Sequence, residues 1–112
     1  MAIISHDIKK VVIKQRTRYI APCVKSGIYF VQAVGGSGLI KIGWSIDCDE
    51  RLRALQIGSP VPLCILAIIP GTRRREQLLH EYWKHLRAHG EWFQPSPELL
   101  ESIAQSQRMF NA

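Results

Sequence analysis

Two short segments place a tyrosine and a lysine where they could act together. Gly27-Ile28-Tyr29 and Lys41-Ile42-Gly43 flank the glycine-rich stretch 35–38, a pattern that predicts a tight β-hairpin. Because paired strands present side chains on common faces, we expect Tyr29 and Lys41 to share one surface. A tyrosine with an ordinary pKa of about 10 is a poor base at neutral pH. A neighbouring cation would lower that pKa and allow the hydroxyl to take part in proton transfer.

Two further candidates lie on predicted helices. Arg51 follows Gly43 by eight residues and falls in the first turns of a helix; its planar guanidinium suits the charge that gathers on the oxygens of a phosphoryl transition state. Glu76 opens a second helix, and one carboxylate together with phosphate oxygens and waters can hold Mg²⁺. His80 lies four residues later on the same helical face. Glu76 could equally stabilise its helix N-terminus, and Tyr29 could be an ordinary strand aromatic.

Basic side chains gather in two places. Residues 1–26 hold six basic side chains and one acidic one, a net charge of +5, whereas the rest of the chain carries only +1 of the total +6. Such a segment is typical of an arm that binds nucleic acid, or of a solubilising tail. Three arginines open the helix of Glu76, where the helix dipole disfavours cations, so we infer phosphate contact. The candidate nucleic-acid-binding residues are Lys9, Lys10, Lys14, Arg16, Arg18, Arg73, Arg74 and Arg75.

The elements that must position these residues follow from local patterns. Strands are predicted at 28–33, 39–42 and 63–69, the last as a continuous apolar run. Asp47 caps a helix that ends at Ile57, and Thr72 caps a longer helix that continues to His89-Gly90. The apolar stripe of that longer helix is Leu78, Leu79, Tyr82, Trp83 and Leu86. A short aromatic stretch at 91–93 precedes a last helix that begins at Ser96-Pro97, while residues 5–20 fit helix or strand.

Composition bounds the class of protein. A chain of 112 residues that is 46% apolar is expected to be one globular domain. No run is long enough for a membrane span, and we predict no membrane partner and a cytoplasmic location. The three cysteines form no CxxC pair, which indicates a reducing compartment and disfavours a zinc site built on the histidines.

The ordered motifs together resemble a known family. They read G-I-Y, then K-I-G-W-S-(x5)-R, an E-x-x-x-H helix and G-E-W-F, between about residues 26 and 103. This set resembles the GIY-YIG endonuclease superfamily, most closely its meiotically-up-regulated-gene and phage open-reading-frame branch with a GIY…KIG variant. The resemblance implies an α+β fold of order β-β-α-β-α plus a C-terminal helix. Its core would be a three-stranded antiparallel sheet flanked by helices, and it would cut phosphodiesters with one divalent ion, Mg²⁺ or Mn²⁺.

The resemblance also implies roles for individual residues. Tyr29 matches the tyrosine that helps to activate water, Arg51 the arginine on the scissile phosphate, and Glu76 the carboxylate that holds the metal. Two positions depart from the wider superfamily pattern. Lys41 replaces the tyrosine of the YIG half and would orient water or bind phosphate. Leu55 stands where a second base is common, a loss for which His80 could compensate.

These observations predict a metal-dependent endonuclease that hydrolyses DNA, of the kind carried by phages or mobile elements. We expect a basic segment at 1–25, a nuclease domain at 26–107 and a C-terminal tail at 108–112. The short chain has little room for a recognition domain, so cutting would be loosely specific or directed by a homodimer or partner protein. The alternatives are a non-catalytic nucleic-acid-binding module of the same fold, an enzyme that acts on RNA, and a protein-interaction domain.

Overall fold

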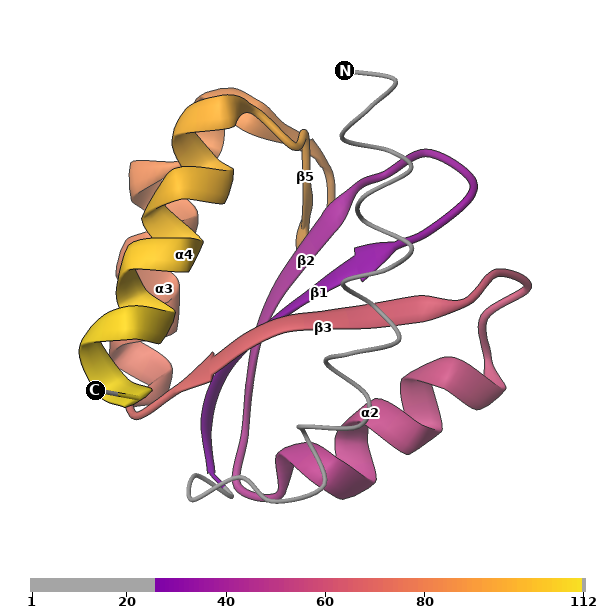
Figure 1. The fold of residues 1–112 in the computed structure, drawn as a ribbon, viewed down its shortest axis with the longest axis horizontal. Coiled ribbons are helices and arrows are strands. Elements are labelled where there is room, and N and C mark those ends of the chain that lie inside the picture. The colour runs from indigo at the N-terminus through magenta and orange to yellow at the C-terminus, as the bar shows by residue number, and fades with distance from the viewer. Residues whose placement is uncertain (1–25, 112) are drawn as a thin grey trace.

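A computed structural model describes residues 26–111, which form a helix-flanked antiparallel sheet (Figure 1). The elements in chain order are β1 (Gly27–Ala33), β2 (Ile40–Ser45), α2 (Cys48–Ile57), β3 (Leu63–Ile69), α3 (Arg73–Tyr82), a 3-10 turn (Lys84–Leu86), β4 (Arg87–His89), β5 (Trp92–Phe93) and α4 (Pro97–Asn111). The predicted α+β class is confirmed. Residues 108–111, predicted as a tail, belong to α4. No helix in the described range is long and apolar enough to cross a membrane.

The sheet has the strand order β3-β1-β2-β5-β4, with β1, β2 and β5 as its inner strands. β1 and β2 pair antiparallel, with Tyr29 opposite Gly43 and Val31 opposite Lys41. Tyr29 and Lys41 are therefore diagonal neighbours on one face, as the hairpin pattern predicts. The turn between them includes Gly35 and Gly38 at φ of 84° and 74°, a region that favours glycine.

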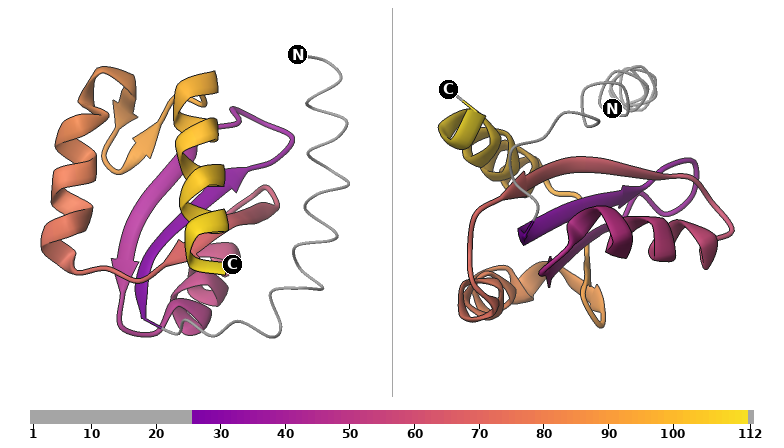
Figure 2. Two further views of the ribbon diagram at one scale, coloured as in Figure 1. Left: turned by 60° about the vertical axis from the view of Figure 1, so that its left-hand side comes forward. Right: turned by 90° about the horizontal axis from the view of Figure 1, so that it is seen from below.

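Alternate side chains of the strands enter two hydrophobic cores. One core lies between the sheet and the helices α3 and α4; it contains Ile28, Phe30, Ile42, Trp83, Phe93 and Leu99. The other lies between the sheet and α2; it contains Tyr29, Val31, Cys48, Leu52 and Ile68. Figure 2 shows α4 and α2 at separate places around the curved sheet. The sheet is thus covered on both faces, and the polar side chains of β2 that face α2 lie in largely buried surroundings.

The helix ends follow the predicted capping residues. The side chain of Asp47 accepts a hydrogen bond from the backbone N–H of Glu50, and Thr72 accepts one from that of Arg75. Ser96 does the same for Leu99 at the start of α4, where Pro97 is the first helical residue. These caps fix where α2 and α3 begin, and hence where Arg51 and Glu76 lie.

The predicted length of α3 is wrong. The helix ends at Tyr82, and the chain returns through β4 and β5 to pair with the free edge of β2, with Lys41 opposite Trp92. Two short strands thus extend the predicted three-stranded sheet to five. The pairing buries Phe93 completely, whereas Leu78 and Tyr82 of the predicted stripe are 56% and 71% exposed. Burial of Phe93 and hydrogen bonds between β5 and β2 thus stabilise the strand arrangement in place of the predicted further turns of α3.

Candidate active site

The site begins where the Tyr29 ring crosses the neighbouring strand. A Cβ built on Gly43 would lie 2.3 Å from Cζ and from the hydroxyl of Tyr29, far inside contact distance. Glycine at this position therefore lets the ring lie flat against β2. Tyr29 of the segment Gly27-Ile28-Tyr29 is thus packed directly against Gly43 of the segment Lys41-Ile42-Gly43. Tyr29 is also buried, with only 1% of its surface exposed.

Arg51 of α2 reaches the same tyrosine. Its guanidinium donates a hydrogen bond to the Tyr29 hydroxyl, an arrangement that favours the phenolate. Burial nevertheless raises the pKa of Tyr29 above its usual value, and the Glu91 carboxylate adds to that effect. Arg51 thus lowers this pKa, as expected of a nearby cation, but desolvation exceeds its influence. With its pKa raised, the Tyr29 hydroxyl keeps its proton at neutral pH.

Lys41 meets a carboxylate that the sequence motifs did not single out. Its Nζ lies 2.8 Å from Oε1 of Glu91 and 5.6 Å from the centre of the Trp92 ring. Lys41 is only 9% exposed, so it loses most of its hydration and depends on this partner. The backbone carbonyl of Glu91 accepts a hydrogen bond from the N–H of Ile42 at 3.1 Å, which keeps this residue beside β2.

Glu76 is a buried carboxylate on the first turn of α3. It is 7% exposed, and its ion pair with Nε2 of His80 spans 3.7 Å, too long for a hydrogen bond. Burial raises the pKa of Glu76, and the charge of Glu91 raises it further against the opposing effects of His80, Arg73 and Lys41. Glu76 thus lies largely buried beside a second carboxylate, with His80 as its ion-pair partner.

His80 is held by the sheet. Its Nε2 lies 2.8 Å from the carbonyl oxygen of Ile42, and its ring meets Phe93 edge-on at 5.1 Å. A carbonyl oxygen only accepts hydrogen bonds, so Nε2 carries the proton. This nitrogen is therefore not free to act as a base or as a metal ligand while the contact holds.

The acidic groups of the site suit a divalent cation. Ligand atoms of Glu76, His80 and Glu91 all lie within 4.8 Å of one another. Two carboxylates at this separation repel each other, and a cation between them would relieve that repulsion. Hard ions such as Mg²⁺ prefer oxygen ligands, which Glu76 and Glu91 supply. The residues present therefore fit the metal expected at Glu76.

The basic residues predicted to bind nucleic acid divide into three groups. Arg73 lies with its guanidinium 4.8 Å from the centre of the Trp44 ring and acts electrostatically on Glu76, so it borders the site. Arg74 and Arg75 are exposed on the first turn of α3 and do not join the cluster. The other five, Lys9, Lys10, Lys14, Arg16 and Arg18, lie outside the described residues.

A known domain family matches most of the chain. The sequence model of the T5orf172 domain matches residues 26–108, about three quarters of the chain. The chain belongs to the T5orf172 domain family. This is a phage open-reading-frame domain related to GIY-YIG-like and nuclease-associated families. No curated protein and no solved structure matches the chain.

The matched T5orf172 domain contains every site residue that the structure brings together. Tyr29, Lys41, Arg51, Glu76 and His80 were singled out from the sequence, and Glu91 was missed as a site residue. Glu91 begins the E-W-F part of the G-E-W-F motif, which therefore signalled its presence but not its role. Its contact with Lys41 spans 50 residues and arises from the pairing of β5 with β2. Sequence spacing alone does not reveal such a contact.

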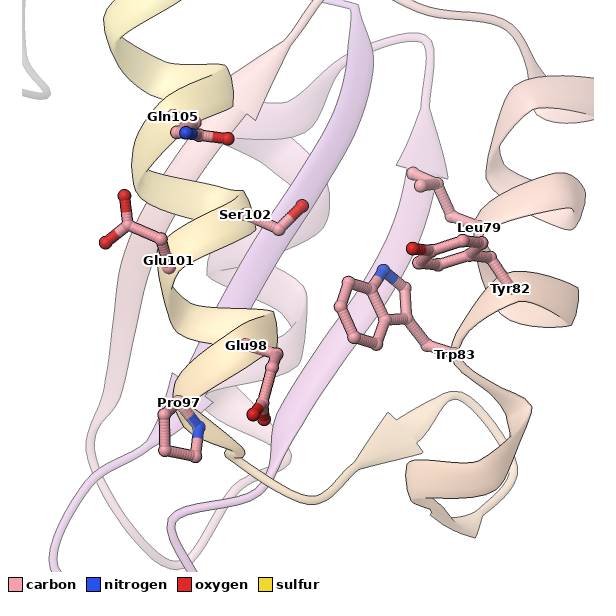
Figure 3. A pocket seen from close by; sticks show the side chains of 8 residues that line it. All are labelled: Leu79, Tyr82, Trp83, Pro97, Glu98, Glu101, Ser102 and Gln105. Atoms are coloured by element: carbon pink, nitrogen blue, oxygen red, sulfur yellow. The ribbon is translucent and has the colours of Figure 1, made fainter.

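A groove of about 710 Å³ lies on another part of the T5orf172 domain, between α3 and α4 (Figure 3). Leu79, Tyr82 and Trp83 line one wall, and the first turns of α4, including Glu98 and Glu101, line the other. Tyr82 and Trp83 meet edge-on at 4.9 Å. None of the groove residues belongs to the cluster around Glu76, so the groove and the candidate active site are separate features.

Proposed function

We propose that the protein is a metal-dependent endonuclease of GIY-YIG type that hydrolyses phosphodiester bonds in DNA. The observation that carries the proposal is the largely buried Glu76 carboxylate in one electrostatic cluster with Tyr29, Lys41, Arg51 and Glu91. An arginine, a tyrosine and a carboxylate that can hold a metal ion together supply charge stabilisation and proton transfer, which support phosphodiester hydrolysis. The ordered motifs of the sequence supply the assignment to this class.

In the proposed reaction, Arg51 donates hydrogen bonds to the scissile phosphate and stabilises the charge that develops on its oxygens. The Tyr29 oxygen accepts from Arg51, so its own hydrogen is free to orient the attacking water. On ionisation, Tyr29 would accept the proton of that water. A divalent ion on Glu76, when bound, would neutralise phosphate charge and support the leaving oxygen.

His80 acts in this scheme as a positioning residue rather than as the second base that replaces Leu55. Its protonated Nε2 is bound to the carbonyl of Ile42 and faces Glu76 at 3.7 Å. The histidine thus joins α3 to β2 and limits the movement of the Glu76 carboxylate. Leu55 itself packs against the core between α2 and the sheet.

Basic residues outside the cluster would bind the DNA backbone. Arg73 lies beside the site on the ring of Trp44, and Arg74 and Arg75 are exposed on the same turn. Contacts of this kind position a duplex without reading its sequence. The basic segment at 1–25 would add affinity that depends strongly on salt.

The experiment that tests this function is nicking of supercoiled plasmid by the purified chain with Mg²⁺ or Mn²⁺. Glu76→Ala should lower the nicking rate by at least about 100-fold, the scale seen when one group that stabilises a transition state is removed. Glu81→Ala is the matched control, since Glu81 lies on the same helix in an exposed ion pair with Lys84. Full activity of Glu76→Ala would exclude the proposed mechanism.

The second candidate is a nucleic-acid-binding module without turnover. The observation that favours it is the raised pKa of Tyr29, which leaves the tyrosine protonated at neutral pH. Leu55 removes the other common base. This candidate predicts binding that does not depend on metal and an intact plasmid with every cation. A parallel assay on RNA of the same sequence decides between the two nucleic acids.

A further inference from the structure

The Glu91 carboxylate has two neighbours of opposite charge. One is the Lys41 ammonium, whose Nζ is 2.8 Å from Oε1 of Glu91. The other is the acidic cluster, in which ligand atoms of Glu76, His80 and Glu91 fall within 4.8 Å of one another. The Glu91 side chain is 43% exposed, so it can be reached from solvent. One carboxylate therefore serves a lysine and borders a site that suits a metal ion.

The burial of Glu76 indicates that a cation belongs in the cluster. This side chain is only 10% exposed, its ion-pair partner Nε2 of His80 lies 3.7 Å away, and a ligand atom of the Glu91 carboxylate lies within 4.8 Å of it. The proton on Nε2 of His80 is used by the carbonyl of Ile42, 2.8 Å away. A largely buried carboxylate beside a second carboxylate is costly unless a cation or a proton compensates it.

The nitrogen of His80 that faces Glu76, Nε2, is therefore unsuitable as a metal ligand. The carboxylates of Glu76 and Glu91 remain as candidate ligands. Oxygen atoms that share a Mg²⁺ or Mn²⁺ ion at about 2.1 Å lie roughly 3 to 4 Å apart. A small movement of the exposed Glu91 side chain from its present separation would reach that range. A movement that brings Oε1 of Glu91 to the ion would draw this oxygen from Lys41, its present partner.

We propose that Glu91 is a second ligand, with Glu76, of the divalent cation, and that Lys41 is the resident counter-cation which the metal displaces from Glu91. The inference rests on the proposed function in that it concerns the same metal. Lys41 lies on the strand face that carries Tyr29, so metal binding would release its ammonium on the same face as the Tyr29 side chain. The lysine would thus contact phosphate only when the metal is bound.

Binding of Mn²⁺ to the full chain without DNA tests the exchange, with free Mn²⁺ measured by electron paramagnetic resonance. Lys41→Met should tighten Mn²⁺ binding about tenfold, because the competing cation is gone and the site is more negative. Glu91→Gln should weaken binding at least about tenfold and cancel the gain in the double variant. Lys84→Met is the control, because it breaks an exposed lysine–glutamate pair of 3.1 Å outside the site.

The wild-type chain gives a second readout that needs no substitution. Reductive methylation of Lys41, followed by mass spectrometry, should become several-fold faster when Mg²⁺ is added, whereas methylation of Lys84 should not change. Unchanged or weaker Mn²⁺ binding by Lys41→Met, wild-type binding by Glu91→Gln, or methylation of Lys41 that ignores Mg²⁺ would each overturn the proposal. Since no DNA is present, a failure to cut DNA would count against the proposed function alone.

Discussion

At the scale of the residue, Tyr29 decides the pH dependence that the site should show. Burial raises its pKa, and the hydrogen bond from Arg51 only partly opposes this effect. Below that pKa the phenolate fraction, and with it the rate, should rise about tenfold per pH unit. We therefore expect plasmid nicking to increase continuously from about pH 6.5 to about pH 9. Measurement of the single-turnover rate across this range tests the expectation.

The control for this profile is Tyr29→Phe, which keeps the ring against Gly43 and removes the hydroxyl. It should lower the rate by about 10²- to 10⁴-fold and abolish the rise with pH. Tyr82→Phe alters a tyrosine that is 71% exposed and should leave both unchanged. An undiminished alkaline rise in Tyr29→Phe would assign the ionisation to another group.

At neutral pH we expect the wild-type protein to be less stable than the Glu76→Gln variant, whose side chain has nearly the same shape and no charge. Because the folded-state pKa of Glu76 is raised above 4.5, the protonated form stabilises the fold, and this contribution disappears as the pH rises through the folded pKa. Glu76→Gln should therefore match wild type at a pH of about 4.5 and exceed it by about 0.5–2 kcal/mol at neutral pH. Urea unfolding at both pH values measures the difference. Glu81→Gln, at an exposed position, should show no such gap.

At the scale of the element, the β1–β2 hairpin depends on the absence of a side chain at Gly43. The Cβ of Gly43→Ala would lie 2.3 Å from two atoms of the Tyr29 side chain, so the ring must move. We expect the free energy of unfolding to fall by about 1–3 kcal/mol, and nicking to fall as well. Gly36→Ala, where the nearest atom is a Val61 methyl at 3.8 Å, should cost far less. Equal urea midpoints for the two variants would contradict this steric role of Gly43.

Elements with local signals could be predicted from the sequence. The strand Leu63–Ile69 and the helix Cys48–Ile57 agree with their predicted ranges because an apolar run defines the strand and the N-cap Asp47 defines the start of the helix. The end of α3 could not be predicted. The apolar stripe favours further helix, whereas the free edge of β2, which no local pattern reveals, pairs with β5 instead.

The same distinction applies to the site. Tyr29 and Lys41 could be placed on one surface because hairpin pairing is local, and His80 beside Glu76 because helical spacing is local. Glu91 could not, since its contact with Lys41 depends on β5 reaching β2. The raised pKa of Tyr29 could not be predicted from the sequence either, because it follows from how deeply the side chain is buried between the sheet and α2.

At the scale of the whole molecule, charge and site occupy different parts of the chain. The segment 1–26 carries +5 and the remainder +1. Deletion of residues 1–24 should weaken DNA binding and flatten the salt slope by about 0.9 log units for each phosphate that is no longer bound, while metal-dependent nicking persists at low salt. Fluorescence anisotropy over a salt series measures the slope. A full-length chain with Gln at Lys9, Lys10, Lys14, Arg16 and Arg18 should show the same flattening, and an unchanged slope in both variants would assign the segment no DNA contact.

The most direct test of the proposed nuclease activity is the fate of supercoiled plasmid bound by the wild-type chain. We predict that Mg²⁺ or Mn²⁺ converts the plasmid to open circles, and that a chelator stops the conversion while binding persists. The Glu76→Ala variant should bind the plasmid and leave it closed. A wild-type chain that binds the plasmid and leaves it intact with both cations would contradict the proposed activity.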